Sequence, residues 1–457
     1  MAAKATMTER SFNLVVPLAH EATDMRTTDT AGSRRDRSGA VTLLSARQGD
    51  VESTIDPSPA GPGIRTSTTA TRTTTTATTS YALAPSADCN APADFTFQEL
   101  VKAYFDCRRT KRNSASALAF EERLEHNLRD LFDELQAGSY TPGRSICFVI
   151  TRPKAREVWA ADFRDRIVHH LLHNQIGPRF YARFIADSCA CIPGRGTLYA
   201  AERMEAKVRS ITQNWSKPAY YLKLDLANFF VAIDKDILRD LIAVRVIEPF
   251  WMNLAETILF HDPRLDFEYR GDADKLDLVP PHKRLTNQPP HLGLPIGNLS
   301  SQFFANIYLD VLDQFVKHGL RCKHYIRYVD DFVLLHESAQ WLNDALANIN
   351  EFLPAELHAK LNPTKTILQP VDRGIDFVGQ VIKPWHRTLR RRTFNEEMAR
   401  VRTIDAGDLF ETANSYYGLL RQATHSHHDR ARLSNELRRR GHCIAGDITK
   451  TFRRKAA

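Results

Sequence analysis

A pair of adjacent aspartates between two apolar segments constrains the fold of this chain more than any other feature. Asp330 and Asp331 separate Tyr325–Val329 from Phe332–Leu335, and both segments are rich in aromatic and β-branched residues. Such segments favour strands, and two strands joined this directly form a hairpin. The pattern therefore predicts a packed hairpin with two carboxylates at its turn. Aspartates at a turn can bond their own backbone, and a divalent cation can also relieve their mutual repulsion.

A third carboxylate ends a second predicted strand. The leucines of Tyr220–Leu226 occupy alternate positions, so they share one face of the strand and Asp225 lies on the other. Asp225 could simply cap the following helix. Together with the two hairpin aspartates, it could instead clamp two metal ions about 3.5–4 Å apart, as nucleotidyl transfer requires.

The remaining pattern is that of an α+β domain preceded by a low-complexity tail. Residues 1–94 have too little apolar surface to offset the entropy of ordering, so we expect them to be disordered. Beyond them, helical periodicity alternates with short strands, which predicts a small antiparallel sheet with helices packed on it. Other expected elements are strands Cys147–Ile150 and Phe377–Ile382, helices 303–318 and 339–352, and a Pro-rich loop or inserted hairpin over 262–291.

The distribution of charge favours a polyanionic partner. The net charge is +8, and residues 384–457 alone hold 16 Lys or Arg against 8 Asp or Glu. This composition suits contact with a nucleic-acid backbone, although a solvated helical surface has it too. The seven cysteines, an odd number without a CxxC pair, fit a reducing, cytoplasmic setting. No apolar stretch is long enough to span a membrane, so we do not expect a membrane to be a partner of this chain.

Taken in order, these motifs resemble those of reverse transcriptases. Residues 328–331 (YVDD) are similar to the YxDD hairpin of that family, and Asp225 with 228–230 (NFF) is similar to the preceding DxxxxF motif. The resemblance extends over residues 95–420. It implies an RNA-directed DNA polymerase with a right-hand fold. Its expected parts are fingers over 95–215, a palm over 216–384 and a basic helical thumb over 385–457.

The resemblance also implies the cofactor and the partners. Two Mg²⁺ ions would be held by Asp225, Asp330, Asp331 and the backbone carbonyl of Leu226. Lys365, in the motif LNPTKT, would complete the catalytic group near the leaving pyrophosphate. The template would be RNA, the primer DNA or RNA, and the substrates dNTPs.

Other residues are assigned to the nucleotide by their positions in family motifs. Lys154 and Arg156 in the fingers would hold the triphosphate, and Arg suits bidentate contact with phosphate. Phe230 would lie under the sugar and exclude a 2′-hydroxyl. The motif GLPIGNLSSQ over 293–302 resembles the loop and helix start that contact the base pair. Its residues assigned to the nucleotide are Ile296, Gly297, whose lack of a side chain permits close backbone approach, and Gln302.

Four further residues are assigned to the primer or the template in the same way. They are Tyr328 of the hairpin, Arg195 in the PGRGT loop, and Gly374 and Gly379 at the two ends of the motif GIDFVG. Glycines of this kind also make ordinary turns, and a lone Arg or Lys commonly faces solvent.

Within the family, the pattern IGxxxSQ over 296–302 is similar to that of diversity-generating retroelement enzymes. That resemblance implies copying of a template-repeat RNA, misincorporation opposite adenine and a basic accessory protein. Ile296 stands where Gln is common, and an apolar side chain cannot make the hydrogen bonds of an amide, so base-pair geometry would be constrained less strictly. Two alternatives stay open: a cellular or phage-defence reverse transcriptase of related lineage, and a non-catalytic RNA-binding protein built on a polymerase palm.

Overall fold

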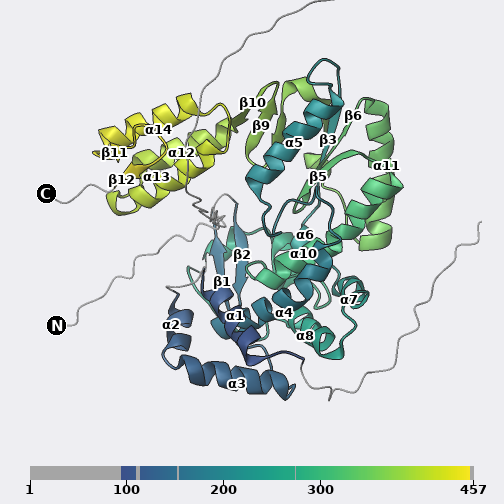
Figure 1. Cartoon of the computed structure of the whole chain (residues 1–457), viewed down its shortest axis with the longest axis vertical. Helices are drawn as coiled ribbons and strands as arrows, with labels where there is room; N and C mark the ends of the chain where they lie inside the picture. Colours follow the sequence, from purple (N-terminus) through teal and green to yellow (C-terminus); the bar gives the residue numbers. More distant parts are fainter. Residues whose placement is uncertain (1–93, 110–113, 152–153, 273, 453–457) are drawn as a thin grey trace, which may run out of the picture. The chain divides into compact units, whose positions relative to one another are not determined.

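The computed structural model describes residues 94–109, 114–151, 154–272 and 274–452. The chain divides into two compact units, Met1–Ser86 and Ala87–Ala457, and every described residue belongs to the second. The tail expected to be disordered, residues 1–94, therefore lies outside the described residues except for Asp94. The described part is α+β with small, mainly antiparallel sheets, which confirms the predicted fold class (Figure 1).

The first half of the described chain is mainly helical. Its helices are α1 (Phe97–Arg108), α2 (Ala115–Glu121), α3 (Leu124–Gln136), α4 (Phe163–Tyr181), α5 (Thr197–Ile211), α6 (Phe229–Ala232), α7 (Lys235–Ala243) and α8 (Pro249–Phe260). Local sequence explains where α1 begins, because Thr96 and Glu99 form a capping box in which each side chain bonds the other's backbone N–H.

A three-stranded sheet is formed by two strands that lie between α3 and α4 in the sequence and by one strand that follows α8. β1 (Ser145–Ile150) pairs antiparallel with β2 (Arg156–Ala160) and parallel with β4 (Phe267–Tyr269). The Pro-rich connection over 262–291 thus contributes a strand, followed by the short helix α9 (Asp274–Asp277) and two 3-10 turns. The buried Glu157 carboxylate fixes it to β2 by accepting hydrogen bonds from the Leu285 N–H (2.8 Å) and the Thr286 hydroxyl (3.3 Å).

The central sheet has the order β5-β6-β3-β7 and is antiparallel throughout. Its strands are β3 (Tyr220–Asp225), β5 (His324–Tyr328), β6 (Asp331–His336) and β7 (Ile367–Pro370). The predicted strands at 220–226, 325–329 and 332–335 are confirmed to within a residue or two. The predicted single strand Phe377–Ile382 is wrong. Val378 and Gly379 both have positive φ (45° and 80°), so the segment turns back as β8 (Ile375–Phe377) and β9 (Gln380–Lys383).

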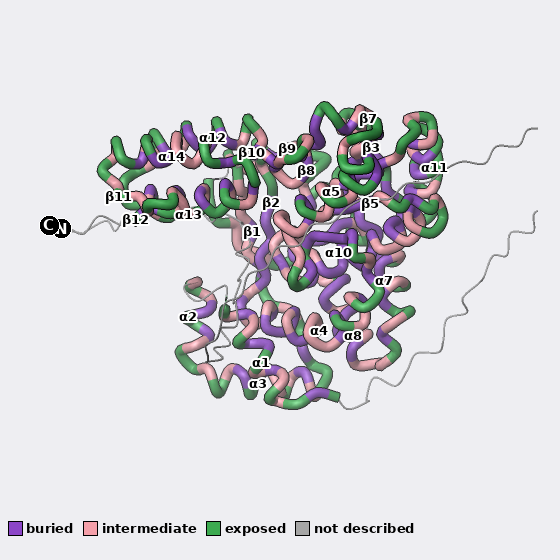
Figure 2. Tube along the Cα trace, turned by 45° about the horizontal axis from the view of Figure 1, so that its top comes forward, coloured by how far each residue is buried: buried purple, intermediate pink, exposed green. Residues whose placement is uncertain are grey.

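Helices pack on both faces of the central sheet. α10 (Leu299–Gln314), which continues as a π-helical turn, and α11 (Ala339–Leu357) share one hydrophobic cluster with Leu222 and Leu224. α5 shares a second cluster with Tyr221 and Val333 on the other face. Figure 2 shows the buried residues concentrated in α4, α10 and the strands. The strands that carry Asp225 and Asp331 are therefore rigidly held, since protein interiors are close-packed.

The C-terminal segment is helical, as predicted. β10 (His386–Leu389) pairs with β9 and leads into α12 (Arg391–Thr403), α13 (Ala406–Arg421) and α14 (His427–Arg439), followed by the short pair β11 (Cys443–Ile444) and β12 (Thr451–Phe452). These helices share a hydrophobic cluster of their own. Among the described residues, no helix is long and apolar enough to cross a membrane.

Candidate active site

The central sheet brings two of the predicted carboxylates directly opposite each other. Asp225, the last residue of β3, is the register partner of Asp331, the first residue of β6. Such antiparallel partners have Cβ atoms about 4.5–5.5 Å apart. Asp330 precedes Asp331 at the turn, and its carbonyl accepts a hydrogen bond from the Leu226 N–H (3.2 Å). The two segments that looked independent in the sequence thus meet at one edge of the sheet.

The backbone around Leu226 leaves its carbonyl outside the neighbouring ladder. Leu226 forms an isolated bridge with Leu361. The hydrogen bonds of that bridge are made on either side, from the Ala227 N–H to the Lys360 carbonyl and from the Asn362 N–H to the Asp225 carbonyl, each 2.8 Å long. The Leu226 carbonyl, predicted as a metal ligand, takes part in neither bond.

The turn that carries Asp330 has a strained residue at its tip. Val329 adopts φ +56°, a left-handed conformation that is rare for a β-branched residue. The buried Arg327 guanidinium donates to the Val329 carbonyl (3.0 Å) and forms a two-point ion pair with the buried Asp313 carboxylate (2.8 and 2.7 Å). Arg327 thereby connects the turn that carries Asp330 to α10.

Two lysines pair with the carboxylates. The Lys365 ammonium lies 2.6 Å from Asp225 Oδ1, and the Lys223 ammonium lies 3.1 Å from Asp331 Oδ2. Lys365, which was predicted to act with the aspartates, contacts one of them in the structure. The other oxygen of Asp331, Oδ1, is buried and makes no hydrogen bond with any described residue. An unpaired buried carboxylate oxygen is costly unless it receives a donor or a cation.

The pKa values reflect this crowding of negative charge. Burial raises the pKa of Asp331 to about 6, although Lys223 opposes the shift. Burial, and next to it the charge of Asp225, raises the pKa of Asp330. Both shifts disfavour the charged carboxylates, so a bound cation would stabilise them.

These residues fit a hard divalent cation. Carboxylate and carbonyl oxygens are the ligands that Mg²⁺ prefers, and the unpartnered Asp331 Oδ1 supplies one such donor that the protein itself does not use. In the described part of the chain, no three His, Cys, Asp or Glu side chains already converge as a ligand set. Lys223 and Lys365 hold two of the carboxylates in ion pairs, so cation binding would require their displacement.

Basic residues expected in the fingers lie near the carboxylates. The charge of Lys365 is the largest cause of a lowered pKa at Lys154, followed by burial and the charges of Lys283 and Arg156. The charges of Lys365 and Arg156 oppose the rise in the pKa of Asp330 that burial and Asp225 cause. Lys154 and Arg156 are exposed. The fold therefore presents a group of cations beside the carboxylates, and Lys283 of the Pro-rich connection joins it without having been predicted.

The loop over 293–302 packs against β2. The Ile296 carbonyl accepts a hydrogen bond from the Trp159 N–H (2.7 Å). A Cβ on Gly297, which has φ +133°, would lie 2.9 Å from the Trp159 carbonyl oxygen. The backbone that Gly297 approaches closely is thus that of β2, and its predicted contact with the nucleotide stays a prediction. Asn298 directly precedes α10, but its side chain makes no capping bond and accepts a hydrogen bond from the Ala161 N–H (3.0 Å).

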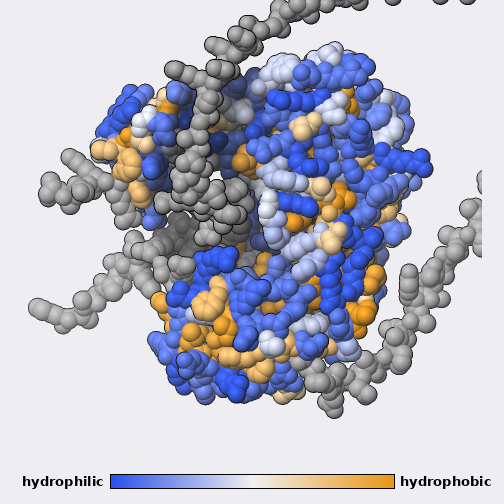
Figure 3. Space-filling view, in the orientation of Figure 1, coloured by the Kyte–Doolittle hydropathy of each residue, from blue (hydrophilic) through white to orange (hydrophobic). Residues whose placement is uncertain are grey.

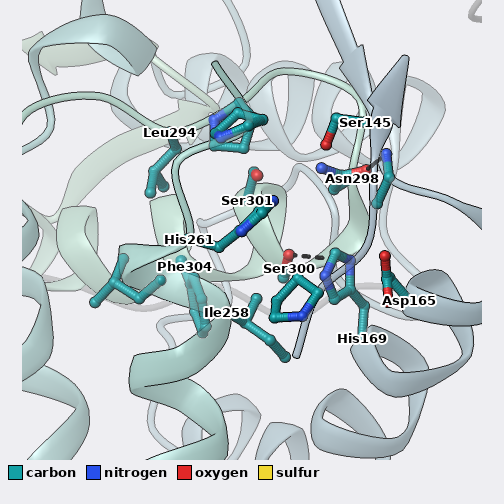
Figure 4. Close-up of a pocket in the computed structure, with 15 residues that line it drawn as sticks. Ser145, Asp165, His169, Ile258, His261, Leu294, Asn298, Ser300, Ser301 and Phe304 are labelled. Atoms are coloured by element: carbon teal, nitrogen blue, oxygen red, sulfur yellow. Dashed lines mark hydrogen bonds between the residues drawn. The ribbon is translucent and has the colours of Figure 1, made fainter. Parts of the chain in front are cut away.

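A small polar cavity lies beneath this loop (Figure 4). Its volume of ≈20 Å³ is room for about one water molecule. Asp165 and His169 of α4 line it together with Ser300 of α10, and Ser300 Oγ lies 3.4 Å from His169 Nδ1. Burial lowers the pKa of His169 to about 3, so its ring is neutral. None of Asp225, Asp330 and Asp331 lines this cavity, so we interpret it as support for the loop.

Phe230 and Gln302 are the remaining residues that were assigned to the nucleotide. Phe230 is partly buried beside Phe229, with ring centroids 5.4 Å apart, and its carbonyl accepts from the Leu294 N–H (2.8 Å). Phe230 therefore joins the Asp225 strand to the 293–302 loop. Gln302 lies in the first turn of α10 and is partly exposed.

The four predicted primer and template residues lie apart from one another in the sequence and have structural roles of their own. Tyr328 packs against the α5-side cluster. The Arg195 guanidinium donates to the Ile185 and Ser188 carbonyls (2.7 Å each), so it holds its own loop together. Gly374 and Gly379 have φ of 88° and 80°, and only Gly374 is also confined by a neighbour, with Val381 Cγ1 2.9 Å from a Cβ there.

Besides Lys283, sequence reasoning missed two residues that support the site, Arg327 and Lys223. Both are charged residues at inner positions of strands that are otherwise apolar. A charged residue within an apolar strand could have indicated an ion pair, because a charge that is taken out of water needs a partner. The partners are Asp313 for Arg327 and Asp331 for Lys223.

One of the comparisons with known proteins identifies a family. The family model described as reverse transcriptase (RNA-dependent DNA polymerase) matches residues 152–382, just over half of the chain. No curated protein matches the sequence. Among solved structures, the chain is similar to telomerase from Candida albicans in complex with a TWJ fragment of telomeric RNA, with 11% identity and a TM-score of 0.40, over 71% of this chain and 59% of that one.

A second solved structure, apo telomerase from Candida tropicalis truncated from its C-terminal domain, has 13% identity and a TM-score of 0.39. That similarity covers 53% of this chain and 54% of the other. The chain therefore spans less than two thirds of the length of either telomerase.

Proposed function

The chain belongs to the reverse transcriptase (RNA-dependent DNA polymerase) family, and on that premise we propose that it synthesises cDNA on an RNA template. Asp225, Asp330 and Asp331 are its catalytic carboxylates. The observation that carries this proposal is the register of β3 and β6, which sets Asp225 opposite Asp331 with Asp330 at the adjoining turn. The basic residues around the aspartates suit the binding of a triphosphate. The same proposal includes the domain boundaries, with fingers over 95–215, a palm over 216–384 and a thumb over 385–457.

Two Mg²⁺ ions would be held by Asp225, Asp330, Asp331 and the Leu226 carbonyl. When bound, they would lower the pKa of the primer hydroxyl and neutralise charge on the leaving pyrophosphate. Lys365, whose side chain is 43% exposed, would leave Asp225 for a substrate phosphate oxygen. Lys154 and Arg156 would hold the triphosphate, and Phe230 would limit the space under the sugar.

Magnesium-dependent primer extension on an RNA template tests the proposal. Asp330→Ala and Asp331→Ala should each lower the rate by roughly 10³-fold or more, since a bound metal contributes several kcal/mol to the transition state. Asp344→Ala, at an exposed position of α11, is the matched control and should retain the wild-type rate. Equal extension by wild type and both site variants would contradict the assignment and favour a non-catalytic RNA-binding protein.

We further propose that the enzyme is the error-prone polymerase of a diversity-generating retroelement, acting in the cytoplasm with a basic accessory protein. The support is the pattern IGxxxSQ over 296–302. Flanking DNA that contains a near-duplicate repeat differing at adenines would favour this role. Without such a repeat, a cellular or phage-defence role would be favoured.

Replacing Ile296 tests the fidelity part of that proposal. Ile296→Gln should lower misincorporation opposite template adenine about fivefold, because one net hydrogen bond contributes ~1 kcal/mol. The loop should tolerate the change, since the Ile296 backbone carbonyl makes the contact with Trp159. Sequencing of extension products measures the error rate, and Ile296→Val, which keeps a branched apolar side chain, is the control. An unchanged error rate at adenine in Ile296→Gln would contradict the hypothesis.

A further inference from the structure

A basic pocket lies on the α5 face of the central sheet, at the end of β5 away from the catalytic turn. It is open, has a volume of ≈230 Å³, and is lined by Arg203, Ala206, Lys207, Ser210, Lys323 and His324. The four α5 residues recur at i, i+3, i+4 and i+7, so one helical face forms a wall of the pocket. None of the described residues that line it is acidic. We refer to it as the α5 pocket.

Positive charge exceeds negative charge at the base of the α5 pocket. The buried Asp187 carboxylate contacts three cations: Arg203 Nε (2.8 Å), Lys207 Nζ (2.8 Å) and Lys317 Nζ (3.1 Å). One carboxylate neutralises only one of them. Lys323, which is exposed, adds a fourth cation at the rim.

The acidic residues of α5 do not offset this excess, because they lie on another face of the helix. Glu205 pairs with Arg387 (3.0 Å) and Glu202 lies 3.8 Å from the same guanidinium. The pKa of His324 is affected by this excess of positive charge. Burial lowers it most, and the charges of Lys207, Lys323 and Lys317 lower it further, to about 4. In Figure 3 the surface over α5 is mainly hydrophilic. The α5 pocket is therefore an attractive position for an anion.

The α5 pocket is distinct from the candidate active site. His324 and Tyr328 are the two ends of β5, and at ~3.3 Å per residue they lie roughly 13 Å apart. None of the residues assigned to catalysis, nucleotide, primer or template lines the pocket. Its volume is also below the range of roughly 300–1,000 Å³ usual for small-molecule sites, so it suits a phosphate group on a larger molecule.

We propose that the α5 pocket binds the phosphodiester backbone of RNA that extends beyond the primer–template duplex in the active site. This inference rests on the proposed function, which makes RNA the polyanion that the chain must hold. Lys and Arg contacts to phosphates release counterions and give salt-dependent affinity without sequence preference. The α5 pocket is thus a second binding site for the template RNA that takes no part in catalysis.

Binding measurements in EDTA, where no chemistry occurs, test the proposal. The probes are a short RNA–DNA primer–template duplex and the same duplex extended by an RNA hairpin. The variant is Ala206→Glu with Lys323→Glu, two exposed positions where carboxylates enter the pocket without removal of the Asp187 contacts. Ala347→Glu on α11, which packs on the opposite face of the sheet, is the matched control.

The double variant should bind the extended RNA about tenfold more weakly at low salt, with a slope of log Kd against log salt that is smaller by ~1–2. Affinity for the short duplex and its extension in Mg²⁺ should stay within about twofold of wild type, as should all values for Ala347→Glu. Unchanged affinity for the extended RNA, or an equal loss on both probes, would overturn the proposal.

A measurement with inorganic phosphate distinguishes a pocket that binds free phosphate from one that binds the phosphates of RNA. If phosphate raises the melting temperature of wild type but not of the double variant, while RNA affinity is unchanged, the pocket takes a free anion and the RNA assignment is overturned. Failure of the proposed function has a different signature: wild type would not extend the short duplex in Mg²⁺, while the binding difference in EDTA would still be read directly.

Discussion

Arg327 is the residue on which the geometry of the YVDD turn depends most. It is 1% exposed and its guanidinium reaches Asp313, Asn306, Ser188 and the Val329 carbonyl. Burial of an ion pair gives little net stability by itself, because desolvation opposes the attraction. The bond to Val329 has a different consequence, since it holds a β-branched residue in the left-handed conformation that places Asp330.

Arg327→Met should therefore lower both stability and activity. The free energy of unfolding should fall by about 3–5 kcal/mol, because Asp313 would be left buried and unpaired. Chemical denaturation measures this loss. The rate of primer extension should fall through kcat more than through KM for the dNTP, because the turn, and not the nucleotide contacts, loses its support.

A second variant separates positioning from stability. Arg327→Met with Asp313→Asn removes both charges and keeps an acceptor for the Tyr325 hydroxyl, which donates to Asp313 in the wild type (2.7 Å). Stability should largely return, whereas kcat should stay low because the Val329 carbonyl still lacks its donor. Recovery of both together would show that Arg327 acts only through stability.

Among the helices, α12 to α14 contain a buried acid that the proposed chemistry does not use. Glu397 of α12 is 7% exposed, and its Oε2 makes no hydrogen bond with any described residue. Burial, followed by the charges of Asp429 and Glu396, raises the pKa of Glu397 to about 8. Glu397 is therefore protonated in the folded protein at neutral pH, where an unfolded chain ionises it.

Stability should consequently fall as pH rises from about 4.5 to about 8. Over that range the unfolded state loses the proton while the folded state keeps it, and above the folded pKa the difference is constant. The loss amounts to roughly 3–5 kcal/mol. Glu397→Gln should flatten the curve, so that the variant is more stable than wild type at pH 8.5 and comparable at pH 5.

Denaturant unfolding at these two pH values checks the expectation. Glu351→Gln, the same change at an exposed position of α11, should leave the pH dependence of wild type intact. If Glu397→Gln kept the full wild-type slope, the buried acid would not be the group that causes it.

For the described molecule as a unit, the central sheet is the organising feature because both of its faces are covered. α10 and α11 pack on one face and α5 on the other. One end of β5 leads to the turn with Asp330 and Asp331, and the other borders the α5 pocket. One rigid sheet thus supports both the proposed chemistry and a proposed site for RNA that lies outside it.

The sequence by itself determined the parts of this protein that depend on local chemistry. Alternating leucines around Asp225 and apolar arms around Asp330 and Asp331 were enough to predict the strands and the turn, because strand periodicity and turn preference act over a few residues. The sequence order of the motifs was enough to assign the three aspartates to one site, which the register of β3 and β6 supports.

Only the tertiary structure decided the contacts between residues far apart in the chain. It paired Arg327 with Asp313 and set Lys317 beside Asp187, 130 positions away. It added β4 of the Pro-rich connection to β1, and it divided the predicted strand over 377–382 at a left-handed turn. These features follow from burial and charge pairing after the chain has folded, and no periodicity along the sequence encodes them.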